Sequence, residues 1–243
     1  MPEKKIVIIP TYNERENIGP MIRKVMAVLP DSHLLIVEDN SPDGTAEVVR
    51  TLMGEYPGRL FMEERAGKQG LGTAYVFGFE WAIARQYDYI FEMDADFSHN
   101  PKSLPSLLRA CQEEGNDVAI GSRYINGVNV VNWPMGRVLM SYYASAYVRF
   151  ITGMEIRDTT AGFKCYRRAG LEKILQRPMK FVGYAFQIEM KFRAWKYGLK
   201  IKEVPIIFRD RTLGESKMSR KIFREAVFGV IQMRMDSWFR KWE

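Results

Sequence analysis

The chain has 243 residues, of which 47% are hydrophobic and 27% charged, a balance that is typical of a globular fold and excludes disordered, collagen-like and coiled-coil chains. No uncharged stretch approaches the roughly 20 residues of a membrane-spanning helix, and the first residues lack the apolar core of a secretory signal, so we expect a cytoplasmic chain without a transmembrane span. The net charge of +7 divides into −7 for residues 1–121 and +14 for residues 122–243, which favours a metal cation in the first half and phosphates or an anionic membrane in the second.

The first half alternates short apolar runs with segments of helical spacing. Strands are expected at residues 5–10, 34–38, 60–64, 89–94 and 117–121, and helices at 14–29, 43–53, 70–85 and 101–111. Because the strands are almost continuously apolar, the pattern predicts a parallel sheet covered by helices on both faces, a doubly wound α/β fold. Ligands bind such sheets beyond the carboxyl ends of the strands.

The regular alternation stops after residue 121. We expect a loop at 128–134, helices at 137–152, 186–197 and 217–242, and strands at 162–166 and 201–208. No repeat, low-complexity tract or linker interrupts the chain, which predicts a single domain over residues 1–243. Cys111 and Cys165 are too few and too far apart for a zinc site, and we expect both in the core. Without a nucleic-acid-binding motif in the basic half, we expect no nucleic acid partner.

Polar loops follow the first, second and fourth strands and are expected to meet at one rim of the sheet. Asp94 and Asp96 end the fourth strand, and two carboxylates one residue apart can converge on one ion where a strand turns into a loop. Hard oxygen ligands suit Mg²⁺ or Mn²⁺ bridging a diphosphate. The alternative is a helix-capping role, because Ser98 and Asn100 precede the helix at 101.

Two further segments of this rim have open interpretations. Asp39 ends the second strand and can accept hydrogen bonds from a base or ribose, or the residues after it form only a turn. Residues 67–72 can offer backbone N–H groups and Lys68 to a phosphate, or serve only as a flexible entry to the next helix.

Eight segments then occur in order along nearly the whole chain: IIPTYNERENI, IVEDNSPDGT, AGKQGLGTAY, EMDADFSHNP, GSRY, NWPMGR, DTTAGFKCY and DRTLGESKM. Together they closely resemble the polyprenol-phosphate (dolichol-phosphate) mannosyltransferases, inverting family-2 glycosyltransferases with the GT-A fold. The resemblance implies a Rossmann-like, mainly parallel sheet with a basic C-terminal amphipathic helix. It also implies a nucleotide-binding half (1–121) and an acceptor-binding, membrane-facing half (122–243), with Mg²⁺ or Mn²⁺ as cofactor.

The implied reaction transfers mannose from GDP-mannose to polyprenyl phosphate and releases GDP. The nucleoside pocket would be lined by Pro10, Tyr12, Glu14, Val37 and Asp39. The diphosphate and its metal would meet Asp94, Ala95 and Asp96, with both aspartates as metal ligands. Arg123 and Arg137 would hold the acceptor phosphate beside Ser141, with Arg123 also bordering the donor, and Arg211 and Lys217 would fold over the donor diphosphate. Asp94, Asp96, Arg123 and Arg137 are therefore the expected catalytic residues. Ser98 stands where some relatives have a third metal ligand, Gln, so we expect water there.

The chemistry needs no proton-abstracting base, because the attacking phosphate is already anionic near neutral pH. We therefore expect His99 to hydrogen-bond its loop and Asp158 to order the acceptor side. Gln187 and Glu189 either contact sugar hydroxyls or cap their helix.

The acceptor lipid points to a membrane surface. An apolar stripe with basic flanks runs along residues 223–242, and a Tyr- and Met-rich helix covers 138–151. Each stripe either lies in the headgroup region or packs on the sheet. The resemblance favours peripheral attachment to the cytosolic face of a membrane, the endoplasmic reticulum in a eukaryote or the plasma membrane in a prokaryote, and allows a small membrane-anchoring subunit.

Two other functions stay open from the sequence. The same fold can use a UDP-sugar such as UDP-glucose, because the base pocket cannot be read from these motifs. A non-catalytic lipid- or nucleotide-binding scaffold is disfavoured, because the carboxylate pair and the cationic residues are all retained.

Overall fold

A seven-stranded sheet forms the centre of the computed structural model, which describes residues 3–210, 220–239 and 242. Its strands lie in the order β3 (Leu60–Glu64), β2 (His33–Glu38), β1 (Lys5–Thr11), β4 (Tyr89–Glu92), β7 (Lys164–Arg167), β5 (Val118–Ser122) and β8 (Ile201–Pro205). Neighbouring strands are parallel except at β7, which is antiparallel to both β4 and β5. The prediction of a mainly parallel sheet is confirmed.

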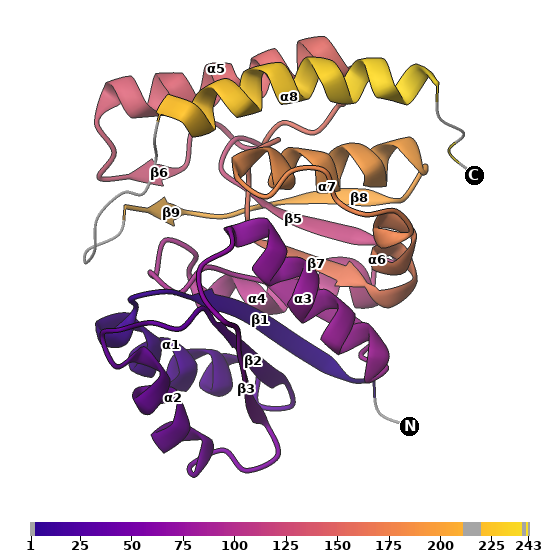
Figure 1. The fold of residues 1–243 in the computed structure, drawn as a ribbon. Helices are drawn as coiled ribbons and strands as arrows, with labels where there is room; N and C mark the ends of the chain where they lie inside the picture. The colour runs from indigo at the N-terminus through magenta and orange to yellow at the C-terminus, as the bar shows by residue number, and fades with distance from the viewer. Residues whose placement is uncertain (1–2, 211–219, 240–241, 243) are drawn as a thin grey trace.

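Helices cover both faces of this sheet (Figure 1). One face is covered by α1 (Arg15–Val28), α2 (Thr45–Met53) and α4 (Leu104–Gln112), which follows the short 3₁₀ helix η1 (Pro101–Ser103). The other is covered by α3 (Leu71–Ala84), α6 (Arg168–Leu175) and α7 (Tyr184–Lys196). Successive side chains of β1 point to opposite faces of the sheet and pack in the two hydrophobic cores there. Ile6 and Ile8 face α3, whereas Val7 and Ile9 face α1. This is why the strand is apolar throughout.

Two further helices lie outside these layers. Helices α5 (Met135–Thr152) and α8 (Arg220–Trp238) lie side by side at the top of Figure 1, and α8 also packs on α7. Among the residues that the structure describes, no helix has both the length and the apolar character needed to cross a bilayer. Buried residues Val148, Val230 and Met233 join this pair to the core beneath it.

The second half departs from the predicted elements in three places. The expected loop at 128–134 contains β6 (Val130–Val131), which pairs in parallel with β9 (Phe208–Arg209). The expected strand at 201–208 is divided after Pro205, because the chain leaves β5 there and reaches β6. Helix α6 was not predicted, since it has only eight residues and begins directly after β7. Elements this short carry no hydrophobic period of their own.

The two cysteines lie in the core, as predicted. Both are buried and free, and the Cys111 thiol donates to the Cys165 carbonyl at 3.5 Å.

Gly78 allows α3 to approach the sheet. A Cβ at this position would lie 2.6 Å from Ile8 Cγ2 and 3.4 Å from Val37 Cγ2, both on fully buried side chains. We expect Gly78→Ala to lower the free energy of unfolding by about 1–3 kcal/mol in chemical denaturation, because overpacking outweighs the gain in helix propensity. The control is Gly136→Ala on α5, where a Cβ has no atom within 4 Å. A Gly78→Ala chain as stable as the wild type would contradict this packing.

Candidate active site

Three loops at the carboxyl ends of β1, β2 and β4 share one edge of the sheet, as predicted. Each contains a non-glycine residue in the left-handed region: Asn13 (φ 57°), Asn40 (φ 55°) and Phe97 (φ 61°). Such a conformation costs about 1–2 kcal/mol for a residue like Phe, and strain of this kind concentrates at functional sites. Hydrogen bonds tie the first two loops together, from Asn13 N to Ser41 Oγ at 3.0 Å and from Glu14 N to Thr45 Oγ1 at 3.0 Å.

The carboxylates of Asp94 and Asp96 are held in the third loop. The Tyr75 hydroxyl donates to Asp94 Oδ1 at 3.0 Å, and the Ser98 amide donates to Asp96 Oδ1 at 3.1 Å. The Asp94 side chain is 37% exposed and so is accessible from the rim. Asn100, and not this pair, caps the following 3₁₀ helix by accepting from the Lys102 amide. The cap expected before residue 101 is therefore present and is made by Asn100, while the metal role of the two aspartates stays a prediction.

The carboxylates of Asp94 and Asp96 fit a divalent ion whose remaining coordination positions are filled by the substrate and water. Within residues 3–210, 220–239 and 242, no group of three or more His, Cys, Asp and Glu side chains could hold a metal. Mg²⁺ is typically bound through one or two carboxylates together with substrate phosphates and water. Two oriented carboxylates at an open rim match that chemistry, whereas a closed structural metal site needs more ligands.

His99 lies behind the carboxylate pair. Its Nδ1 accepts from the Asp94 amide at 3.2 Å, and its ring stacks on Phe163 with centroids 5.0 Å apart. Burial lowers the pKa of His99 despite the nearby aspartates, so the imidazole is neutral. The hydrogen-bonding role expected for this residue matches this geometry.

On the nucleoside side, Asp39 is buried in a bidentate ion pair with Arg65. The distances are 2.6 Å from Arg65 Nε to Oδ1 and 2.9 Å from Nη2 to Oδ2, and Arg65 Nη1 also donates to Thr73 Oγ1 at 3.0 Å. A carboxylate has about four lone-pair positions, so two remain for a ligand. Arg65 was not predicted as a site residue, although it lies two residues before the segment that begins at Gly67.

The other residues predicted for this pocket divide into two groups. Lys68 Nζ lies 5.0 Å from the centroid of the Tyr12 ring, which brings the glycine-rich segment to the nucleoside side of the rim. Pro10 pairs in register with Val37 on β2. The Val37 side chain is fully buried against α3 and belongs to the core, so its place at the nucleoside pocket stays a prediction.

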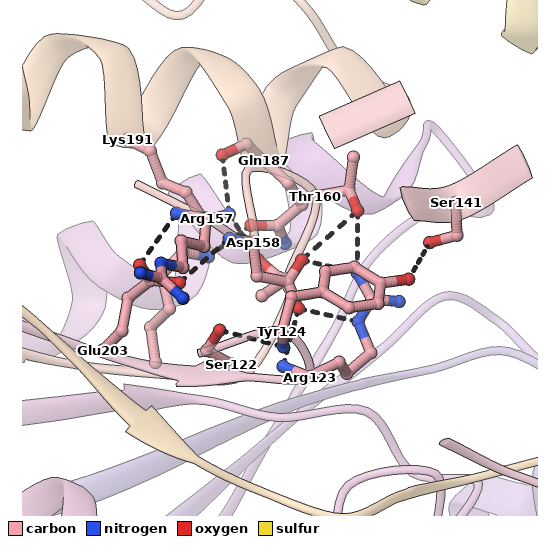
Figure 2. Close-up of polar contacts among 12 residues, drawn as sticks. Ser122, Arg123, Tyr124, Ser141, Arg157, Asp158, Thr160, Gln187, Lys191 and Glu203 are labelled. Atoms are coloured by element: carbon pink, nitrogen blue, oxygen red, sulfur yellow. Dashed lines mark hydrogen bonds and ion pairs between the residues drawn. The ribbon is translucent and has the colours of Figure 1, made fainter. Parts of the chain in front are cut away.

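On the acceptor side, Arg123 follows β5 and is locked by Asp158 (Figure 2). Asp158 accepts from the backbone amide, Nε and Nη2 of Arg123 at 2.9, 2.7 and 2.6 Å, and Nη2 also donates to Thr160 Oγ1 at 2.7 Å. Burial would raise the pKa of Asp158, but the Arg123 charge and its hydrogen bonds lower it, so the carboxylate is ionised. The amides of Arg157 and Asp158 donate in turn to the Glu203 carboxylate at 2.8 and 2.9 Å.

Arg137 and Arg123 both lie near the ring of Trp133. The guanidinium carbons of Arg137 and Arg123 are 4.2 and 5.7 Å from the Trp133 centroid, so the structure brings the two predicted arginines together. Arg137 also donates to Asp210 at 2.9 Å. Ser141 accepts from the Tyr124 hydroxyl at 2.8 Å, as Figure 2 shows. Trp133 lies within the NWPMGR segment, but the sequence alone did not reveal its place beside both arginines.

The rings of His99 and Phe208 lie between the carboxylate pair and Arg123. The Phe208 ring lies 5.6 Å from His99 and 5.4 Å from the Arg123 guanidinium carbon. The carboxylate pair and the two arginines are therefore parts of one rim.

Gln187 and Glu189 are occupied within the protein. Gln187 accepts from the buried Lys164, and Glu189 pairs with Arg193 at 2.6 Å and accepts from the Lys180 amide at 2.9 Å. This geometry favours a structural role over contact with a sugar. Arg211 and Lys217 lie outside the described residues.

Solved structures share this architecture at low sequence identity. Glucosyl-3-phosphoglycerate synthase from Mycobacterium tuberculosis, in complex with phosphoglyceric acid, superposes with a TM-score of 0.70 at 15% identity, over 96% of this chain and 80% of that one. A mannosyltransferase from Pyrobaculum calidifontis, in complex with GDP-Man and Mn²⁺, gives a TM-score of 0.61 at 15% identity, over 99% of this chain and 65% of that one. The fold is thus the GT-A fold.

Proteins of higher identity cover nearly the whole chain. Polyprenol monophosphomannose synthase of Mycolicibacterium smegmatis is 46% identical over 230 residues, covering 95% of this chain and 86% of that protein. Undecaprenyl-phosphate mannosyltransferase of Micrococcus luteus is 42% identical over 238 residues, covering 98% of this chain and 96% of that protein. Residues 6–175 match the family described as Glycosyl transferase family 2. With a family match over more than two thirds of its length and a rim that joins oriented carboxylates to clustered arginines, this chain belongs to glycosyl transferase family 2.

Proposed function

We propose that the chain transfers mannose from GDP-mannose to polyprenyl phosphate, with inversion at the anomeric carbon, and releases GDP. The observation that carries this proposal is a single rim that holds both an oriented carboxylate pair and two arginines near Trp133. The names of the two relatives at 42% and 46% identity support mannose as the sugar and a polyprenyl phosphate as the acceptor.

Asp94 and Asp96 would hold Mg²⁺ or Mn²⁺, which when bound neutralises the charge that develops on the departing diphosphate. Arg137 would bind the acceptor phosphate directly, and Arg123, whose Nε and Nη2 already donate to Asp158 and Thr160, would add its positive charge. Together they would aim one phosphate oxygen at the anomeric carbon. Because that oxygen is anionic near neutral pH, no side chain has to remove a proton. In-line attack then converts an α-linked donor to a β-linked product.

The donor base would be bound beside Asp39, which Arg65 holds in one orientation. The two lone-pair positions left on this carboxylate suit adjacent N–H donors such as those of guanine. Arg211 and Lys217 remain proposed contacts of the donor diphosphate.

We also propose that α5 and α8 dock on the cytosolic surface of a membrane. The exposed large apolar side chains of this face are Met135, Leu139, Met140, Tyr142, Tyr143 and Phe150 on α5, and Phe228, Ile231, Met235, Trp238 and Phe239 on α8 and just after it. Val148 and Val230 pack inward, as the packing alternative expects, while Phe150 and Trp238 are exposed and would make the proposed headgroup contact. A small membrane-anchoring subunit would strengthen the same attachment.

A donor panel tests the reaction. The purified chain is incubated with polyprenyl phosphate and either GDP-mannose or UDP-glucose, with Mn²⁺ or with EDTA. We expect product only from GDP-mannose with the metal present. Asp96→Ala should lower turnover at least about 100-fold, because a metal contributes several kcal/mol to transition-state stabilisation. Asp31→Ala, an exposed substitution outside the rim, is the control. Turnover of UDP-glucose alone would make the mannose assignment wrong, and an unimpaired Asp96→Ala chain would refute the metal role.

The acceptor role of Arg137 predicts a selective kinetic defect. Arg137→Ala should raise KM for a short-chain polyprenyl phosphate about 10- to 100-fold, because hydrogen bonds between charged groups contribute about 1.5–3 kcal/mol. The affinity for GDP, measured by calorimetry, should stay the same. Arg149→Ala removes the same charge from the last turn of α5 and is the control. Weaker GDP binding with an unchanged KM for the acceptor would assign Arg137 to the donor instead.

Vesicle binding tests the membrane surface. Replacing both Trp238 and Phe239 with Ser should weaken sedimentation with phosphatidylglycerol vesicles about 10-fold or more, because two side chains that are 65% and 88% exposed would lose their burial in lipid. Phe77→Ser removes an exposed aromatic ring from α3 and should not matter. Equal vesicle binding by all three chains would contradict this docking face.

A further inference from the structure

The orientation of the Asp94 carboxylate, a proposed metal ligand, depends on a tyrosine of helix α3. We infer that Tyr75 is a positioning residue of the metal site, whose hydroxyl fixes the rotation of the Asp94 carboxylate from inside the core. This inference rests on the metal site of the proposed function and adds to it a residue from α3.

Tyr75 is rigidly placed. It is fully buried, and its ring lies parallel to Phe186 with centroids 6.3 Å apart and stacks on Phe79 at 5.9 Å. Because the side chain is fully buried and packs against both of these rings, it has no room to swing away. Its hydroxyl therefore presents a fixed donor to Asp94 Oδ1 at 3.0 Å.

Asp94 is anchored from two directions. Its amide donates to His99 Nδ1 at 3.2 Å, which holds the backbone, while the tyrosine hydroxyl holds one carboxylate oxygen. The side chain is still 37% exposed toward the rim. A carboxylate held in this way is already oriented when the ion arrives, and the entropy of ordering it is not lost on binding.

Core packing alone does not require this hydroxyl. A phenylalanine would fill almost the same volume, and a buried hydroxyl costs about 1–3 kcal/mol unless it is hydrogen-bonded. Tyr166 in the same core provides the comparison: it is 1% exposed, and its hydroxyl has no hydrogen-bond partner among the described residues. The two tyrosines differ in that only the Tyr75 hydroxyl reaches a site carboxylate.

The experiment compares Tyr75→Phe with Tyr166→Phe in the full chain. Mn²⁺ binding is measured in the presence of saturating GDP from the electron paramagnetic resonance signal of the free ion. We expect the Kd for Mn²⁺ to rise about 10-fold in Tyr75→Phe, the usual effect of removing a hydrogen-bond partner of a metal ligand, and to change less than about 2-fold in Tyr166→Phe. Melting temperatures and GDP affinity without metal show that both variants are folded.

A second readout uses turnover at increasing Mn²⁺. Tyr75→Phe should need about 10-fold more Mn²⁺ for half-maximal turnover and should recover its kcat when the ion is saturating. Mn²⁺ affinity in Tyr75→Phe equal to the wild type, or an equal loss in both variants, would overturn the inference. A wild-type chain that binds no Mn²⁺ with GDP would overturn the metal site as well. A wild-type chain that binds Mn²⁺ but transfers no mannose would overturn the proposed function and leave the role of Tyr75 intact.

Discussion

The spacing of the active site depends on β7, the strand that lies antiparallel between β4 and β5. It separates the strand that leads to Asp94 from the strand that leads to Arg123 by two sheet spacings, roughly 10 Å. Buried ion pairs hold it on both sides: Lys164 of β7 pairs with Glu92 of β4, and Asp158, shortly before β7, pairs with Arg123 after β5. Because a buried charge without its partner costs several kcal/mol, neither strand can shift alone.

Other charged groups of the rim are also held in place by a neighbouring side chain. Asp39 is held by Arg65, Asp158 holds Arg123, and Asp94 is held by the buried Tyr75 hydroxyl. Each of these groups is oriented before any ligand binds, so little reorganisation is needed when charge develops in the reaction. A site that handles two phosphate-containing substrates benefits from this arrangement, because fixed dipoles and charges replace mobile water.

Helix α5 connects the two proposals for the acceptor. Its first turn carries Arg137 beside Trp133, and its outer side exposes Tyr143 and Phe150. A lipid whose tail stays in the membrane can present its phosphate to the arginines only if that helix lies close to the surface. The docking face and the phosphate site therefore impose one consistent orientation on the protein.

The sequence by itself determined the first half of the fold and the location of the rim. Apolar runs such as residues 6–9 predicted strands that are buried on both faces. Asp94 and Asp96 were placed at the carboxyl end of the fourth strand, because hydrophobic period and strand ends are local properties of the sequence. The tertiary structure alone decided the position of β7, the pairing of Arg65 with Asp39, the place of Trp133 beside two arginines and the contact of Tyr75 with Asp94. These contacts join residues that are 4 to 78 positions apart and come from different layers or loops. No local period encodes them, since they arise only when the chain has packed.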